Sequence, residues 1–368
     1  MIKVLVVDDS ALIRKLFTNV LTIESGFEVE IARNGLEALA QLESFRPDVI
    51  TLDVQMPQMD GLECLDRIMI ERPCPVVMVS SLTAAGASAT LEALRLGAVD
   101  FVPKPTGAVS LGIAEFAPTL IEKIRVAANA KLRASSRLRE RVQHRNARSA
   151  TRGAAVPLPL PRANARGAGR ATGDGLVLVG TSTGGPSALE ALLTPLPAEF
   201  PWPIVVAQHM PATFTGPLAR RLDGICALRV VEVVRQQALQ PGYVYIGRGD
   251  ADLIVSLRLA GLVATPAPAQ SGYPWHPSTN RLVKSALECL PAAQLIGVLM
   301  TGMGDDGAAA MAELHAQGGQ TIAEAEETAV VWGMPGELAK SGGADWIVPL
   351  FKIADRLQQL TPANASRS

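Results

Sequence analysis

The chain has 368 residues, which is enough for about two domains with some length left over for a connector. Hydrophobic residues make up 48% of the chain and charged residues 19%, and the 32 Gly and 26 Pro are too few for disorder throughout. This composition excludes fibrous, collagen-like and wholly disordered proteins.

The sequence carries no signal for a membrane span or for secretion. Its apolar runs are of strand length, far below the about 20 residues of a membrane helix. The N-terminal run ends at Asp8 and Asp9, too soon for a signal peptide. The four Cys are scattered, without a C-x-x-C pair, as is typical of reducing compartments. We therefore expect a cytoplasmic protein without a disulfide framework.

The net charge of −1 hides an uneven distribution of charge along the chain. Residues 123–172 hold 13 Lys and Arg but one acid, so this stretch carries +12 and the rest of the chain −13. The pattern predicts two acidic bodies joined by a basic connector. That connector could contact an acidic receptor or an anionic membrane surface, or it could be a solvated hinge.

Residues 1 to about 120 alternate strand-like and helical patterns, which predicts a parallel sheet with helices on both faces. The last helix is predicted from about Pro118 to about Arg145. We expect a doubly wound, five-stranded parallel domain over residues 1–122 and an Arg-, Ala- and Pro-rich linker over 123–174. The strand-like runs are Lys3–Val7, Phe27–Ala32, Val49–Leu52, Val76–Val79 and Val99–Val102.

A second α/β pattern extends over residues 175–357, and a short tail follows at 358–368. We expect a Rossmann-like domain whose sheet is mainly parallel. Its strand candidates are Leu176–Val179, Ile204–Ala207, Leu228–Val231, Val244–Ile246, Leu253–Leu257, Ile296–Met300, Thr321–Ala323 and Ile347–Val348. Its helical candidates are Ser187–Leu193, Ser278–Leu290 and Ala308–Gln317.

Acidic side chains gather at strand ends of the first domain. Asp8 and Asp9 follow the first strand and Asp53 ends the third, while Ser80 and Lys104 follow the fourth and fifth. Carboxyl ends of parallel strands share one sheet edge, where ligands bind. Clustered carboxylates suit Mg²⁺, and a Lys and a hydroxyl suit a phosphoryl group, which together predict an aspartyl phosphate. The Asp pair alone could merely end a strand and cap a helix.

The first domain resembles the receiver domain of two-component response regulators. The resemblance rests on VLVVDDS, on LDVQMPQMDG and on FVPKP, and it covers about residues 1–120. The residues that it implies are the phosphoacceptor Asp53, the Mg²⁺ ligands Asp8, Asp9 and Asp53, the phosphate-sensing Lys104 and Ser80, and the aromatic switch Phe101.

A serine stands at the first strand end of the second domain, in the motif GTSTGGPS at residues 180–187. Ser182 lies between that strand and a helix whose first turn holds Pro186. Backbone N–H groups and the helix dipole at such a position favour an oxyanion. A phosphate-binding turn is the competing interpretation, but the Lys of a Walker motif and the G-x-G-x-x-G fingerprint are both missing.

Two further strand ends carry polar groups that could act with Ser182. His209 follows the second strand of this domain directly, and TGMGDDG brings Asp305 and Asp306 after a later strand. A nucleophile, a base and a carboxylate from three such loops form a Ser–His–Asp triad. The chain order of these residues differs from that of the α/β-hydrolases. His276 stays an alternative base on position alone.

The second domain resembles the catalytic domain of chemotaxis protein-glutamate methylesterases, the CheB family. The matching motifs are STGGP, QHMP, TGMGDDGA and VVWGMP, over about residues 175–355. The residues that the resemblance implies are the nucleophile Ser182, the general base His209, the triad acid Asp306, and Thr183 and Met303 on the oxyanion side. The chain departs from the family pattern at Pro277-Ser278-Thr279-Asn280, at the turn 247–251 and at Glu326-Glu327.

The resemblance implies a phosphorylation-activated serine hydrolase that demethylates glutamate γ-methyl esters, and deamidates glutamines, on chemoreceptors in chemotaxis adaptation. It implies Mg²⁺ for receiver phosphorylation and no cofactor for the ester reaction. The expected partners are methyl-accepting chemoreceptors and the chemotaxis histidine kinase. No DNA partner is expected, and membrane association is expected only through receptors. The alternatives are a receiver-gated esterase or amidase with another substrate, and a non-catalytic binding module.

Overall fold

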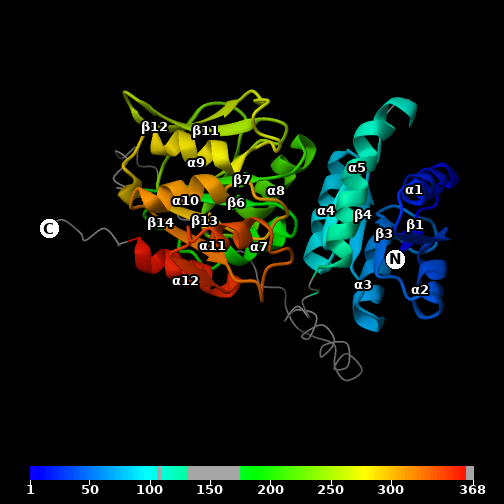
Figure 1. Cartoon of the computed structure of the whole chain (residues 1–368). Coiled ribbons are helices and arrows are strands. Elements are labelled where there is room, and N and C mark those ends of the chain that lie inside the picture. The colour runs from blue at the N-terminus through cyan, green and yellow to red at the C-terminus, as the bar shows by residue number, and fades with distance from the viewer. Residues whose placement is uncertain (106–108, 131, 133–174, 362–368) are drawn as a thin grey trace, which may run out of the picture.

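The computed structural model describes residues 1–105, 109–130, 132 and 175–361. They form two α/β domains that lie side by side (Figure 1). Most of the predicted linker 123–174 and most of the predicted tail 358–368 lie outside the described residues. Among the helices of the described part, none is long and apolar enough to cross a membrane.

The N-terminal domain is a five-stranded sheet with strand order β2-β1-β3-β4-β5, and every pairing in it is parallel. This confirms the predicted doubly wound architecture. The strands are β1 (Ile2–Val7), β2 (Phe27–Ala32), β3 (Val49–Asp53), β4 (Val76–Ser80) and β5 (Asp100–Pro103). The helices are α1 (Ala11–Ile23), α2 (Gly35–Ser44), α3 (Gly61–Glu71), α4 (Ala84–Leu96) and α5 (Val109–Ala128).

Helix α5 corrects one prediction. It was expected to begin near Pro118, where proline is well tolerated, and to end near Arg145. Instead it begins at Val109, holds Pro118 in its interior and ends at Ala128. An interior proline removes a backbone hydrogen bond and costs about 3 kcal/mol. Phe116 and Leu120, on either side of Pro118, are buried in the core of the N-terminal domain. Burial of apolar side chains on this helix outweighs the local preference.

The C-terminal domain has a seven-stranded parallel sheet of order β15-β14-β13-β6-β7-β10-β8 and a three-stranded antiparallel sheet of order β11-β12-β9. The mainly parallel architecture is confirmed. The parallel strands are β6 (Leu176–Thr181), β7 (Ile204–Gln208), β8 (Arg229–Val233), β10 (Tyr243–Gly247), β13 (Leu295–Leu299), β14 (Gln320–Glu324) and β15 (Trp346–Val348). The antiparallel strands are β9 (Gln237–Ala238), β11 (Asp252–Arg258) and β12 (Gly261–Ala267). The helices are α7 (Gly185–Leu193), α8 (Ala212–Ile225), α9 (Thr279–Leu287), η1 (Ala292–Gln294), α10 (Ala308–Ala316), α11 (Met334–Lys340) and α12 (Leu350–Leu360).

Several elements of this domain were not predicted. The sequence pattern did not predict strands β9 and β12 or helices α8, α11 and α12. Helix α8 contains Gly216 and Pro217, both of which signal a break, yet it buries Phe214 and Leu218. For α8, burial of these apolar side chains outweighs the local signals of a break.

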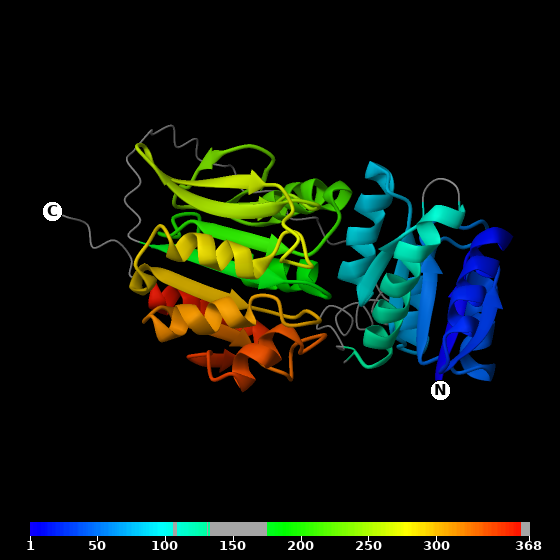
Figure 2. The same cartoon turned by 45° about the horizontal axis from the view of Figure 1, so that its top comes forward.

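The two domains meet along α4 and β5 of the N-terminal domain and α7 and α8 of the C-terminal domain, as two views of the chain show (Figures 1 and 2). Phe101 on β5 packs on Phe214 of α8, with ring centroids 4.3 Å apart. Arg221 of α8 pairs with Glu92 of α4 at 3.2 Å. The contact lies at the carboxyl end of β6 in the C-terminal sheet, since Thr183, in the loop after β6, binds Asp100 of the N-terminal domain.

Candidate active site

The backbone of Ser182 is held from several sides at the end of β6. Its N–H donates to the carbonyl of Thr301 at 3.0 Å, and its own carbonyl accepts from Gly185 N at 2.8 Å. Gln208 Nε2 also donates to that carbonyl, at 3.1 Å. A Cβ on Gly302 would lie 2.8 Å from Ser182 Cβ, so glycine is needed there. These contacts fix the serine between β6 and α7.

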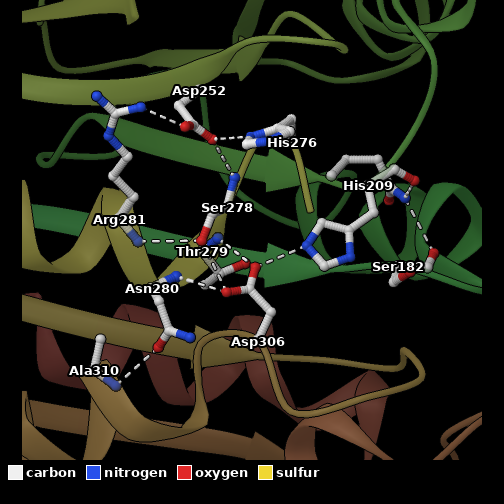
Figure 3. Close-up of polar contacts among 11 residues, drawn as sticks. Ser182, His209, Asp252, His276, Ser278, Thr279, Asn280, Arg281, Asp306 and Ala310 are labelled. Atoms are coloured by element: carbon white, nitrogen blue, oxygen red, sulfur yellow. Dashed lines mark hydrogen bonds and ion pairs between the residues drawn. The ribbon is translucent and has the colours of Figure 1, made fainter. Parts of the chain in front are cut away.

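His209 lies between Ser182 and Asp306 (Figure 3). Its Nε2 lies 2.8 Å from Asp306 Oδ2. Because an ionised carboxylate only accepts hydrogen bonds, Nε2 carries the proton and Nδ1 presents a lone pair. Nδ1 is buried and has no hydrogen-bond partner among the described residues. Trp275 stacks on the ring, parallel to within 2° and 5.8 Å away between centroids. The imidazole is thus oriented as a base.

Asp306 is 1% exposed and accepts four hydrogen bonds. They come from His209 Nε2, from Ser278 Oγ at 2.9 Å, and from the backbone N–H groups of Thr279 at 2.6 Å and Asn280 at 3.1 Å. The two N–H groups belong to the first turn of α9, whose dipole also favours an anion.

The donors determine the charge of Asp306. Burial alone would raise its pKa, but the hydrogen bond from His209 and those from Asn280 and Thr279 outweigh burial and hold the pKa below its ordinary value. The carboxylate therefore stays ionised beside the imidazole. The neighbouring Asp305 is exposed, so the structure separates the two acids of the predicted turn.

Three central strands explain why these side chains meet. Strands β13, β6 and β7 are neighbours in the sheet, and their carboxyl ends carry the loops of Asp306, Ser182 and His209. The structure thus brings together the three residues that the motifs indicated. His276, the alternative base, pairs instead with Asp252 through Nδ1 at 2.9 Å.

The two predicted oxyanion residues lie in the loops after β6 and β13. Thr183 is 3% exposed, and its hydroxyl donates to Asp100 Oδ2 of the N-terminal domain at 2.6 Å. Met303 is half-buried. The hydroxyl of Thr183 is therefore occupied by the other domain, one residue away from Ser182.

The acidic edge of the N-terminal domain is assembled as predicted. Ligand oxygens of Asp8, Asp9 and Asp53 all lie within 4.8 Å of one another. Lys104 Nζ lies 3.0 Å from Asp8 Oδ2 and 2.8 Å from Asp53 Oδ2. Burial raises the pKa of Asp53, and the hydrogen bond from Lys104 offsets only part of this rise. A set of three carboxylates that share the Lys104 ammonium fits a Mg²⁺ ion.

The predicted phosphate-sensing residues lie around this edge. The Ser80 hydroxyl is fully buried and donates to the carbonyls of Gly86 at 3.2 Å and Ser81 at 3.3 Å, so it contacts α4. Phe101 is 4% exposed and lies in the contact with the other domain. The acidic edge and the domain contact thus share α4 and β5.

Sequence reasoning missed the supports of both sites. Ser278 was predicted as the start of a helix and was noted, with Asn280, as a departure from a family pattern. Neither was predicted to bind Asp306, and Trp275, Asp252 and Asp100 were not singled out. An N-cap serine after a proline was a readable signal for a helix start. Nothing in the sequence indicated which distant carboxylate that helix start would bind.

Comparison with known proteins gives two family matches. The family model described as CheB methylesterase matches residues 177–357, and that of the response regulator receiver domain matches residues 4–113.

Curated relatives match along the whole chain. The protein named protein-glutamate methylesterase/protein-glutamine glutaminase 2 of Rhodopseudomonas palustris is 55% identical over 368 residues, 100% of both chains. Its counterpart numbered 3 from Rhodospirillum rubrum is 53% identical over 359 residues, 97% of this chain and 95% of that one. The crystal structure of the Thermotoga maritima CheB methylesterase catalytic domain is 37% identical, with a TM-score of 0.49, and covers 50% of this chain and 98% of its own.

Proposed function

We propose a reaction for this site from one premise, namely that the chain belongs to the CheB family of protein-glutamate methylesterases/protein-glutamine glutaminases that carry a receiver domain. The reaction is hydrolysis of glutamate γ-methyl esters on chemoreceptors, and deamidation of glutamine side chains by the same groups. The observation that supports it most strongly is the buried His209–Asp306 hydrogen bond. It leaves Nδ1 of His209 without a partner among the described residues, on a ring that lies between Asp306 and Ser182 (Figure 3).

The proposed mechanism follows from this geometry. Ser182 Oγ attacks the ester carbonyl while His209 Nδ1 takes its proton, and Asp306 stabilises the imidazolium that forms. The imidazolium then protonates the leaving methoxide, which departs as methanol, or ammonia departs from glutamine. Water attacks the acyl-enzyme with His209 again as base, and this step releases glutamate and free Ser182.

Thr183 and Met303 are the proposed oxyanion side of the site. Their loops flank Ser182 at the ends of β6 and β13, where backbone N–H groups can face an oxygen of the tetrahedral intermediate. The ester reaction proposed here uses side chains and backbone groups of this chain alone.

The receiver is the proposed switch. Asp53 would take the phosphoryl group, with Asp8, Asp9 and Asp53 holding Mg²⁺, which neutralises the charge that gathers on the phosphoryl oxygens. Lys104 and Ser80 would then turn to the phosphoryl group. The Ser80 hydroxyl now bonds to the carbonyl of Gly86, so its movement would disturb α4.

That disturbance reaches the active site through the domain contact. Helix α4 packs on α7 and α8, and Asp100 of β5 binds the Thr183 hydroxyl next to Ser182. In the unphosphorylated state the receiver would therefore limit access to the serine. About two added negative charges at the acidic edge would bias the contact toward opening, with Phe101, which packs on Phe214, as the aromatic switch residue.

The proposed partners follow from the same function. Methylated chemoreceptors are the substrate, a chemotaxis histidine kinase is the phosphodonor, and the location is the cytoplasm. Contact with membranes would be indirect, through receptors, and no nucleic acid is involved.

Methanol release from methylated chemoreceptor membranes tests the proposal. It is measured with and without Mg²⁺ and a small phosphodonor, beside the Ser182→Ala variant. We expect release that increases with the phosphodonor and is lost in the variant. Folded wild-type protein that releases no methanol under any of these conditions would refute the substrate assignment.

A further inference from the structure

A second buried carboxylate lies behind the Asp306 cluster. Asp252, the first residue of β11, is 1% exposed. Its Oδ1 accepts from His276 Nδ1 and from the backbone N–H of Ser278, both at 2.9 Å, and its Oδ2 accepts from Arg281 Nη1 (Figure 3). The positive guanidinium offsets the charge of Asp252, which would otherwise repel Asp306.

The donors to Asp252 come from the segment that also supports the catalytic pair. Ser278 donates its N–H to Asp252 and its O–H to Asp306, and thus connects the two carboxylates. The direction of its O–H is fixed, because Ser278 Oγ also accepts from Arg281 N at 3.3 Å. Trp275, in the same segment, stacks on His209.

We propose that Asp252 is a positioning residue for the His209–Asp306 pair and that it acts through Ser278. By holding the Ser278 backbone, Asp252 fixes where Ser278 presents its O–H to Asp306 and where the first turn of α9 presents its N–H groups. Asp306 in turn determines the orientation of the His209 ring. Among the described contacts of Asp252, none reaches Ser182 or His209, so its effect on them is indirect, through Ser278 and Asp306.

This inference rests on the proposed function for its kinetic test, but it also has a readout that needs no substrate. In full-length protein labelled with ¹⁵N-histidine, the Nε2–H proton of His209 reports its hydrogen bond to Asp306, and His209→Gln assigns the signal. The variants are Asp252→Asn, Ser278→Ala and their combination. Asp223→Asn is the matched control, because this carboxylate also accepts a backbone N–H, from Val230 on the edge strand β8.

We expect Asp252→Asn to lower kcat for methanol release about 10- to 100-fold with KM unchanged, as displacement of a catalytic group does. The His209 Nε2–H signal should shift or broaden. Ser278→Ala should do the same, and the double variant should be no worse than the poorer single variant, because both lie on one path. Asp223→Asn should leave kcat and the signal unchanged.

Three results would overturn the inference. They are an unchanged His209 signal in folded Asp252→Asn, additive losses in the double variant, and an equal signal change in Asp223→Asn. If Asp252→Asn does not fold, Asp252→Glu decides, because it keeps the charge but moves the acceptor oxygens, and an unaltered His209 signal there refutes the positioning role. Wild-type protein without methanol release but with a signal that responds to Asp252→Asn would refute the proposed function and leave the positioning role standing.

Discussion

The active site around Asp306 and the acidic edge around Asp53 have the same architecture, but their carboxylates differ in how fully they are paired. Each gathers side chains from the carboxyl ends of adjacent parallel strands. Asp306 receives four hydrogen bonds and has a lowered pKa, whereas the buried Asp53 has a raised pKa because burial outweighs its bond with Lys104. The Asp306 carboxylate already has its donors within the chain, while the receiver carboxylates still favour an added cation. A preorganised site suits catalysis, and an incomplete one suits a switch.

Removing the proposed nucleophile Ser182 should lower methanol release more than any other change considered. We expect Ser182→Ala to lower methanol release about 10⁴-fold or more, because the covalent step is lost while the oxyanion side remains. Initial rates with the phosphodonor present measure this. Thermal unfolding should be near that of the wild type, since only one half-buried hydroxyl is removed. Methanol release by folded Ser182→Ala near the wild-type rate would mean that another group attacks the ester.

Asp306→Asn tests whether the active site needs the negative charge of Asp306. The amide cannot stabilise an imidazolium as a carboxylate does, so kcat should fall by about 10³- to 10⁴-fold. Asp305→Asn is the matched control, because it makes the same change one residue away at an exposed position. Equal losses in both variants would contradict the assignment of Asp306.

Asp53→Ala tests whether phosphorylation of the receiver activates the enzyme. Without the phosphoacceptor we expect basal methanol release to stay low and the response to Mg²⁺ and phosphodonor to disappear. The ratio of rates with and without phosphodonor is the measurement. An Asp53→Ala protein as active as the phosphorylated wild type would show that the receiver does not limit the enzyme through phosphorylation of this residue.

The placement of the proposed catalytic trio and of the acidic edge was predictable because each motif follows a buried strand directly. Ser182, His209 and Asp53 need only the rule that ligands bind at the carboxyl ends of parallel strands. The supports were not predictable in the same way. Asp252 is 26 residues from Ser278 in sequence, and Asp100 is 83 residues from Thr183. Such pairs depend on tertiary packing, which no local pattern encodes.

The same limit applies to the fold. Central strands of the parallel sheets, such as β6 and β13, are fully buried apolar runs, and the sequence predicted them. Helix α8 was missed because Gly216 and Pro217 indicate a break, and the start of α5 was misplaced for a similar reason at Pro118. Local signals fail where burial against a distant surface is worth more than propensity.

The smallest expected effect comes from an ion pair at the contact between the two domains. Arg221 lies 3.2 Å from Glu92 of α4 and 3.6 Å from Glu190 of α7. Arg221→Glu replaces attraction with repulsion at a partly exposed position, which should weaken the docked receiver by about 1 kcal/mol. Basal methanol release should then increase about fivefold, with a smaller further response to phosphodonor. Arg220→Glu is the control, because it makes the same charge change on an exposed neighbour of the same helix. If neither variant raises the basal rate, this ion pair does not hold the receiver over the active site, and the buried Asp100–Thr183 and Phe101–Phe214 contacts must do so alone.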